Sequence, residues 1–307
     1  NQPFYSENIN QLTAPNYDGF PLDLYLSPEP VLPVQFSRGC YYKDCAFCAL
    51  TLDHQNFRQR DPGKTVDDLV WLKERYGAQS FFFTDECFAL SPTKRLCQQM
   101  IDRQVNVKWT CELRFEKNLT RELLGQMRDA GCLKIVFGLE SFNQRVMDFM
   151  KKGIKQESVR RIVDDCVDLG IAVHCYVIVG FPTEKEEEAL DTMNFVVGNK
   201  KLHESYGFSC QPCLFDLEKE APIMSDPGSY GIRRIMRPAT EDLSLGFFYE
   251  VQEGMTPAQA EQLYQQVYEK ISEVVCELPF NYSMADGLLY IARAKSQALQ
   301  VPQPTGS

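Results

Sequence analysis

Short apolar runs alternate with amphipathic segments through the first two-thirds of the chain. The runs are five to eleven residues long, and polar or turn-forming residues bound them, a pattern typical of buried strands. They cover residues 31–36, 80–84, 107–115, 133–139, 171–180 and 205–215. Helical periodicity fills the stretches between them. Strand–helix units repeated in this way predict a parallel sheet with helices outside it.

We therefore expect the α/β class, as a (β/α)6 partial TIM-like barrel over residues 31–215 with a C-terminal helical extension. A doubly wound open sheet is the competitor, although no Gly-rich phosphate loop follows the first strand. Residues 1–30 are proline-rich and predict an arm or linker. Residues 216–307 predict a loop-rich and helical extension, with helices near 256–275 and 282–298, which covers one barrel opening.

Composition excludes several classes of protein. The 307 residues carry a formal net charge of −10, which argues against a broad nucleic-acid or anionic-membrane surface. No apolar run approaches the roughly 20 residues that span a bilayer, and the start does not resemble a signal peptide. The 12 cysteines are mostly scattered, which favours reduced thiols in the cytoplasm. Because the first residue is Asn1, we expect a fragment or a processed form.

Three cysteines stand close together after the first predicted strand. Cys40, Cys45 and Cys48 follow the pattern C-x4-C-x2-C. Thiolates are soft ligands that suit iron–sulfur clusters and zinc. Three thiolates leave one iron of a cubane cluster open, whereas structural zinc usually has four protein ligands. His54 is the only nearby candidate for a fourth ligand. A structural or sensory metal in a binding protein remains the alternative.

This loop resembles that of the radical S-adenosylmethionine (SAM) enzymes, in which three cysteines follow the first barrel strand. Phe47 holds the aromatic place before the last cysteine. The first gap has four residues where the commonest pattern has three, as in several cobalamin-associated subfamilies. The segment 14–23 is similar to the connector after a cobalamin domain. The usual Asp-x-His-x-x-Gly cobalamin motif is absent from the sequence.

The resemblance implies an oxygen-sensitive [4Fe-4S] enzyme that reductively cleaves SAM to a 5′-deoxyadenosyl radical. That radical would take hydrogen from an unidentified peptide or small-molecule substrate, and a flavodoxin or ferredoxin would donate the electron. A cobalamin-dependent radical methyltransferase is the enzymatic alternative, with its cobalamin module missing or supplied in trans. Cobalamin is therefore possible, but we do not expect this chain alone to bind it.

Two further motifs imply SAM contacts at the ends of the second and third predicted strands. Asp85 and Glu86 occupy the place where the family carries an acidic motif that receives the SAM amino group. Arg114 ends the third strand and is expected to pair with the SAM carboxylate. The alternatives are a solvated acidic loop for the two acids and a salt bridge to Glu112 or Glu116 for the arginine.

The fourth and fifth strands end in similar motifs. Gly-Leu-Glu-Ser at 138–141 is similar to the family element in which a carboxylate binds the ribose hydroxyls. Glu140 is expected in that role, and Ser141 there or as the cap of the next helix. Val179 and Gly180 resemble the segment that packs on the adenine, although an apolar strand followed by a turn is common.

Four residues are weaker candidates for contact with the substrate. His174 and Tyr176 share one face of the fifth strand and could line the cavity, although barrel packing is the simpler interpretation. Cys210 and Cys213 have the C-x2-C spacing, so they could hold a metal or supply a reactive thiol. With two ligands visible, core thiols are the simpler interpretation.

Overall fold

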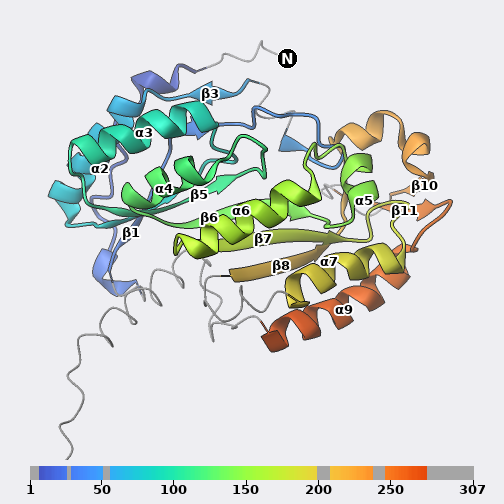
Figure 1. The fold of residues 1–307 in the computed structure, drawn as a ribbon. Helices are drawn as coiled ribbons and strands as arrows, with labels where there is room; N and C mark the ends of the chain where they lie inside the picture. Colours follow the sequence, from blue (N-terminus) through green and yellow to red (C-terminus); the bar gives the residue numbers. More distant parts are fainter. Residues whose placement is uncertain (1–6, 26–28, 51–55, 199–207, 238–245, 275–307) are drawn as a thin grey trace, which may run out of the picture.

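A single parallel sheet forms the centre of the fold. The structure, a computed structural model, describes residues 7–25, 29–50, 56–198, 208–237 and 246–274. In spatial order, the strands are β1 (Val31–Val34), β4 (Ser80–Phe83), β5 (Lys108–Leu113), β6 (Cys132–Glu140), β7 (Ala172–Val179) and β8 (Phe208–Leu214). Spatial order follows sequence order without the reversal of a doubly wound sheet. The predicted partial barrel is therefore confirmed (Figure 1).

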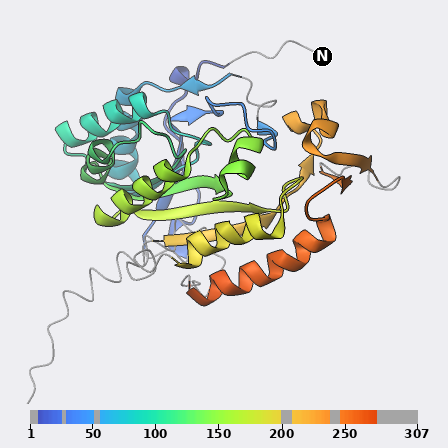
Figure 2. The same ribbon diagram turned by 45° about the vertical axis from the view of Figure 1, so that its right-hand side comes forward.

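Helices cover one face of this sheet (Figures 1 and 2). They are α2 (Pro62–Tyr76), α3 (Leu90–Asp102), α4 (Arg121–Asp129), α5 (Gln144–Phe149), α6 (Gln156–Asp168) and α7 (Glu186–Gly198). Right-handed crossovers between parallel strands place successive helices on the same side of a barrel sheet. Among the described residues, no helix has the length and apolarity that crossing a membrane requires.

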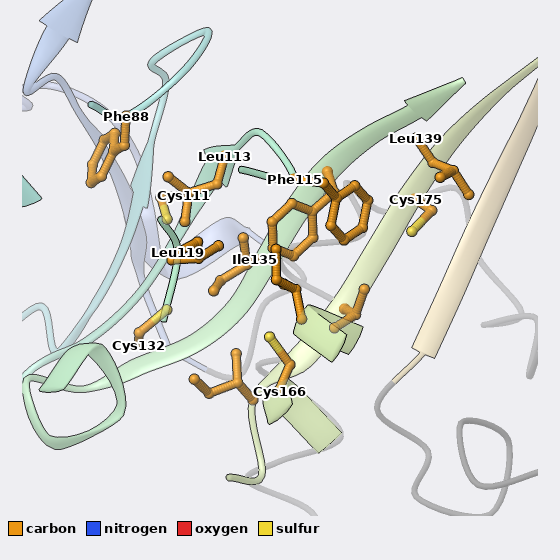
Figure 3. Packing of buried hydrophobic residues seen from close by; sticks show 14 of the residues in the cluster. Phe88, Cys111, Leu113, Phe115, Leu119, Cys132, Ile135, Leu139, Cys166 and Cys175 are labelled. Carbon is orange, nitrogen blue, oxygen red and sulfur yellow. The ribbon is translucent and has the colours of Figure 1, made fainter. Parts of the chain in front are cut away.

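The two faces of the sheet differ in chemistry because side chains alternate along each strand. On β5, β6 and β7 the odd-numbered residues pack under the helices, as Figure 3 shows for Cys111, Leu113 and Ile135. Phe115, just past β5, stacks on Phe137 with ring centroids 4.1 Å apart. The even-numbered residues face the barrel interior. They include Thr110, Glu112, Lys134, His174 and Tyr176, so the interior is polar.

The N-terminal arm lies against the first strand–helix unit. It contains two short 3-10 turns, Ile9–Gln11 and Leu22–Leu24. The Tyr17 amide donates to the Tyr76 hydroxyl on α2 at 2.9 Å, and the Tyr17 hydroxyl donates to the Pro33 carbonyl on β1. Proline within β1 is tolerated because β1 is an edge strand.

The extension after β8 contains more regular structure than expected. Three strands form an antiparallel sheet in the order β10 (Ile232–Met236), β11 (Gly246–Val251) and β9 (Leu217–Glu218). Two 3-10 turns, Pro222–Ser225 and Pro227–Tyr230, precede β10. The sequence did not predict these strands, because they are short and lack a clear alternating pattern.

The extension divides between two places on the barrel. Its first part packs against the cysteine loop: Ile223 donates its amide hydrogen to the Ala46 carbonyl at 2.8 Å, and both side chains share one apolar cluster. The long helix α9 (Pro257–Val274) instead packs on α7 and β8, outside the sheet. The predicted helix near 256–275 is confirmed, but it does not cover an opening. The helix expected at 282–298 lies outside the described residues.

Gly131 provides a test of how tightly β5 and β6 are joined. Its φ is +96°, and an added Cβ would lie 1.9 Å from the Val107 carbonyl oxygen. We expect Gly131→Ala to lower the free energy of unfolding by roughly 2–5 kcal/mol, through a strained φ and overpacking. Gly125 in α4 has no neighbour within 4 Å of such a Cβ. Gly125→Ala should stabilise by about 0.5–1 kcal/mol.

Urea denaturation of both variants, followed by circular dichroism, measures the difference. Equal midpoints for Gly131→Ala and Gly125→Ala would contradict this account of the β5–β6 contact.

Candidate active site

The cysteine loop leaves the barrel at the carboxyl end of β1. It begins after β2 (Ser37–Arg38), which pairs antiparallel with β3 (Arg58–Gln59), so a short ribbon closes its base. Cys40, Cys45 and Cys48 all lie on this loop, as the sequence predicts. His54 lies outside the described residues. Functional residues of parallel α/β folds gather at this end of the strands.

Two carboxylates after β4 hold the start of the loop. Asp85 is 1% exposed, and its carboxylate accepts from the Phe36 amide at 3.0 and 3.1 Å and from the Ser37 amide. Burial raises its pKa to about 7. The Asp85 carboxylate thus binds backbone amides at the start of the loop, and its contact with the SAM amino group stays a prediction. Glu86 Oε2 accepts the Gly39 amide at 2.9 Å.

The three thiols differ in their surroundings. A hydrogen bond with the Cys87 thiol lowers the pKa of Cys40 to about 5, whereas burial raises the pKa of Cys45 and raises that of Cys48 to about 11. Among the described residues, none of the three forms a disulfide bond. Within the described ranges, no three Cys, His, Asp or Glu side chains already form a metal-binding group. The assignment of the ligands therefore rests on thiol chemistry and spacing.

Arg114 reaches from the end of β5 to the cysteine loop. Its guanidinium lies 3.4 Å from the ring centroid of Tyr42, and Nη1 lies 3.8 Å from the sulfur of Cys45. Nη2 donates to the Lys152 carbonyl at 2.5 Å. The expected alternative partner is also present, since Nε lies 3.6 Å from Glu116. Nε nevertheless makes no hydrogen bond although it is buried, so it can still donate to an anion.

A buried ion pair stands at the end of β6. Lys152 Nζ donates to Glu140 Oε1 at 2.8 Å, and both side chains are less than a tenth exposed. Burial alone would lower the pKa of Lys152, but the charges of Glu140 and Cys45 outweigh it and raise that pKa. A Cβ on Gly138 would lie 2.4 Å from Glu140 Oε1, so only glycine leaves room for the pair.

Glu140 is also held in an uncommon backbone conformation. Its φ is +63°, and the pairing of β6 with β7 shifts register between Gly138 and Glu140. A positive φ at a non-glycine residue is costly and is found mainly at functional sites. Among the described residues, Glu140 makes no hydrogen bond through Oε2, which leaves that oxygen for a hydroxyl donor.

Ser141 is not the cap of the next helix. The N-cap of α5 is Asn143, whose side chain accepts from the amides of Arg145 and Val146. Ser141 is fully buried; its hydroxyl lies 3.3 Å from that of Thr192 on α7 and accepts the Asn143 amide at 3.1 Å. The residue therefore joins β6 to α7 and to the turn before α5, and its contact with the SAM ribose stays a prediction.

The turn after β7 is already satisfied by protein groups. The Gly180 amide donates to Glu184 Oε2 at 2.7 Å, and its carbonyl accepts the Tyr249 hydroxyl at 3.4 Å. The Val179 carbonyl accepts the Phe215 amide at 2.9 Å. These backbone groups already have protein partners, and the packing of Val179 and Gly180 on an adenine stays a prediction.

Of the four residues expected to contact the substrate, His174 and Cys210 are buried, whereas Tyr176 and Cys213 are accessible from the barrel interior. His174 is fully buried with Nδ1 2.8 Å from the Ser209 hydroxyl, whereas Tyr176 is half-exposed on the interior face. Cys210 packs under the helices and Cys213 is exposed toward the interior. Residues three apart on a strand face opposite ways, so these two thiols cannot share a metal.

Two residues that the sequence did not predict, Lys152 and Tyr42, connect the elements of the site. Tyr42 lies within the four-residue gap of the cysteine motif, covers Arg114 and donates to the Lys151 carbonyl at 2.9 Å. The Lys152 ammonium lies 5.5 Å from the ring centroid of Phe47. The sequence signal for Tyr42 was the aromatic residues between the first two cysteines of the motif. For Lys152 there was no signal, because the sequence Lys-Lys-Gly does not show which lysine is buried.

The model of the radical SAM superfamily matches residues 34–196, more than half of the chain. The chain belongs to the radical SAM superfamily. The matched range contains the cysteine loop, Arg114 and the Glu140–Lys152 pair. Curated relatives include an uncharacterized methyltransferase of Pyrococcus horikoshii, 28% identical over 204 residues, which cover 65% of this chain and 43% of that protein.

A second curated relative is the anaerobic magnesium-protoporphyrin IX monomethyl ester cyclase of Rubrivivax gelatinosus. It is 30% identical over 160 residues, which cover 51% of this chain and 29% of that protein. This radical SAM chain therefore spans less than half the length of these two curated relatives. The match to both is confined to a part of each protein, so their whole activities do not transfer with it.

Solved structures of cobalamin-dependent radical SAM enzymes share the fold. Apo OxsB superposes with a TM-score of 0.66 at 14% identity, covering 95% of this chain and 49% of that one. TsrM of Kitasatospora setae, with cobalamin and a [4Fe-4S] cluster bound, gives 0.59 at 16% identity, covering 87% and 61%. The shared fold spans the barrel and much of the extension.

The site fits the cofactors of the superfamily, a [4Fe-4S] cluster and SAM. The free thiols of Cys40, Cys45 and Cys48 would hold the cluster. The unbonded Nε of Arg114 suits the SAM carboxylate, and Oε2 of Glu140 suits a ribose hydroxyl. The Arg114 Nε is buried, so a ligand that accepts from it also removes the cost of leaving that donor without a hydrogen bond.

Arg114→Ala tests the assignment of the SAM carboxylate. Losing a charge-assisted pair in a partly buried site costs on the order of 2–4 kcal/mol. SAM affinity, measured by anaerobic equilibrium dialysis and normalised to bound iron, should fall roughly 30- to 1000-fold. Arg121, whose side chain is half-exposed beside Asp165 and Asp168, supplies the matched control. Arg121→Ala should bind SAM normally, and normal binding by Arg114→Ala would show a purely structural arginine.

Proposed function

We propose that this chain is the radical SAM barrel of a cobalamin-assisted enzyme that methylates a carbon of its substrate. The observation that carries the proposal is the meeting of the cysteine loop, Arg114 and the Glu140–Lys152 pair at one end of the sheet. Methyl transfer is favoured by the relatives, among them the methyltransferase of Pyrococcus horikoshii and the cytidylyl-2-hydroxyethylphosphonate methyltransferase of Streptomyces wedmorensis.

When bound, the cluster and SAM supply one-electron chemistry that opens a carbon–sulfur bond of SAM. The protein orients SAM through Arg114 and Glu140 and withholds water from it. Lys152 holds Glu140 through Oε1 in the buried mouth, which directs Oε2 toward a hydroxyl donor. Tyr42 and Tyr41 close the outer side: the Tyr41 hydroxyl donates to Glu116 at 2.5 Å.

Hydrogen abstraction without methyl transfer is the second candidate. The relatives named as cyclases support this candidate, because their names describe a reaction other than methyl transfer. Both candidates require an electron donor, for which a flavodoxin or ferredoxin is suitable. The eleven described cysteines are free thiols, which favours a reducing cytoplasm as the working compartment.

A binding experiment tests whether this chain alone holds cobalamin or needs a separate cobalamin-binding module. The one described histidine, His174, is buried in β7 and cannot reach a cobalt from below. We expect this chain, reconstituted anaerobically with iron, sulfide and excess hydroxocobalamin, to retain no stoichiometric corrin after gel filtration. It should still form 5′-deoxyadenosine from SAM under reductant, measured by chromatography.

Adding a separately produced cobalamin-binding protein of the same cell is the complementary arm, and SAM-dependent methylation should require it. A corrin absorbance of one per chain from this protein alone would contradict the expectation. It would also place the cobalamin site within these 307 residues.

A further inference from the structure

The barrel interior below the SAM-binding end forms polar layers. Cα partners across neighbouring strands define one layer, which contains Glu112, Val136, His174 and Ser209. The layer above it contains Gly138, Tyr176 and Gln211. Gln211 is exposed and Glu112 is half-buried, so the upper part of the interior is open to ligands.

Glu112 is the one acidic side chain of this layer, and it is partly open to the interior. Among the described residues, its carboxylate makes no hydrogen bond or ion pair. Burial, followed by the charges of Glu86 and Glu140, raises its pKa to about 7, against the opposing influence of Lys134 and Lys152. A partly desolvated carboxylate without a partner is costly unless a donor or cation joins it.

The neighbouring charges do not provide that partner. Lys152 is bonded to Glu140, and Lys134 is 1% exposed, on the layer below. Lys134 lies diagonal to both Glu112 and His174, and its charge helps to lower the pKa of His174 after burial, so that imidazole stays neutral. Among the described residues, the two layers therefore contain one acidic side chain, Glu112, and otherwise neutral residues.

Glu112 lies deeper in the barrel than Arg114 and Glu140, the residues expected to bind SAM. Glu112 precedes Arg114 by two residues on the same face of β5, which places it roughly 7 Å further into the barrel. Among the described residues, two buried atoms on this face make no hydrogen bond: His174 Nε2 in the same layer and Thr110 Oγ1 in the layer below. A polar ligand beside Glu112 could satisfy such atoms.

We propose that Glu112 anchors the substrate of the proposed reaction by binding a protonated amine or an equivalent cationic nitrogen. Tyr176 and Gln211, on the facing strands, supply neutral hydrogen bonds around that nitrogen. The inference rests on the proposed function for the reaction, but substrate binding is separable from turnover. The competing source of the same chemistry is the amino group of SAM.

Paired probes that differ in charge but hardly in shape test the proposal. The reconstituted holoenzyme is titrated anaerobically, by calorimetry, with butylamine against 1-butanol and with phenethylamine against 2-phenylethanol. Each titration is done without SAM and with saturating SAM. We expect the wild-type protein with SAM bound to prefer the ammonium probe about 10- to 100-fold.

Glu112→Gln, which keeps the shape of the side chain, should abolish this preference while iron content and SAM affinity stay at wild-type values. Glu122→Gln is the control, because Glu122 is exposed in the first turn of α4. It should keep the preference. Because no turnover is measured, failure of methyl transfer would leave these results interpretable.

Three outcomes would overturn the proposal. The first is a wild-type protein that does not prefer either ammonium probe, including one that binds neither probe. The second is a preference that Glu112→Gln retains. In the third, saturating SAM abolishes the preference for the ammonium probes, and Glu112→Gln binds SAM more weakly than the wild-type protein. That result would assign Glu112 to the SAM amino group.

Discussion

Two buried cations hold the working end of this barrel together. Arg114 and Lys152 come from different elements, and charges in a low-dielectric interior are stable only when paired. Their pairing links four segments: Arg114 bonds the Lys152 carbonyl and lies on Tyr42 and Cys45, and the Lys152 ammonium bonds Glu140. These contacts fix the cysteine loop, β5, β6 and the turn after α5 relative to one another.

The extension after β8 supports the same end of the barrel from outside. Its first turns share an apolar cluster with Ala46 of the cysteine loop and with Met150 of the turn that carries Lys152. The Ala46 amide donates to the Met150 carbonyl at 2.9 Å, and its own carbonyl accepts from Ile223. The loop that carries the thiols is thus held between the barrel and the extension, which suits a site that must exclude water.

The strands were predictable because buried parallel strands are continuous apolar runs, and the motifs at their ends were predictable from their order. Details that depend on the direction of a side chain were not. Asp85 and Glu86 look alike in sequence, yet Asp85 turns inward to the backbone. Cys210 and Cys213 have metal-ligand spacing, but both lie on β8, where their side chains point to opposite faces of the sheet. The burial of Lys152 depends on where a turn meets β6, which has no local pattern.

Metal analysis of the anaerobically reconstituted protein tests the central claim, that the cysteine loop holds a cluster beside Arg114 and Lys152. We predict about four irons and four sulfides per chain in the wild-type protein and in Cys213→Ala, whose thiol lies in the barrel interior. Cys48→Ala should lose the cluster while circular dichroism shows the fold retained. Stoichiometric zinc in the wild-type protein, or full iron content in Cys48→Ala, would contradict the account.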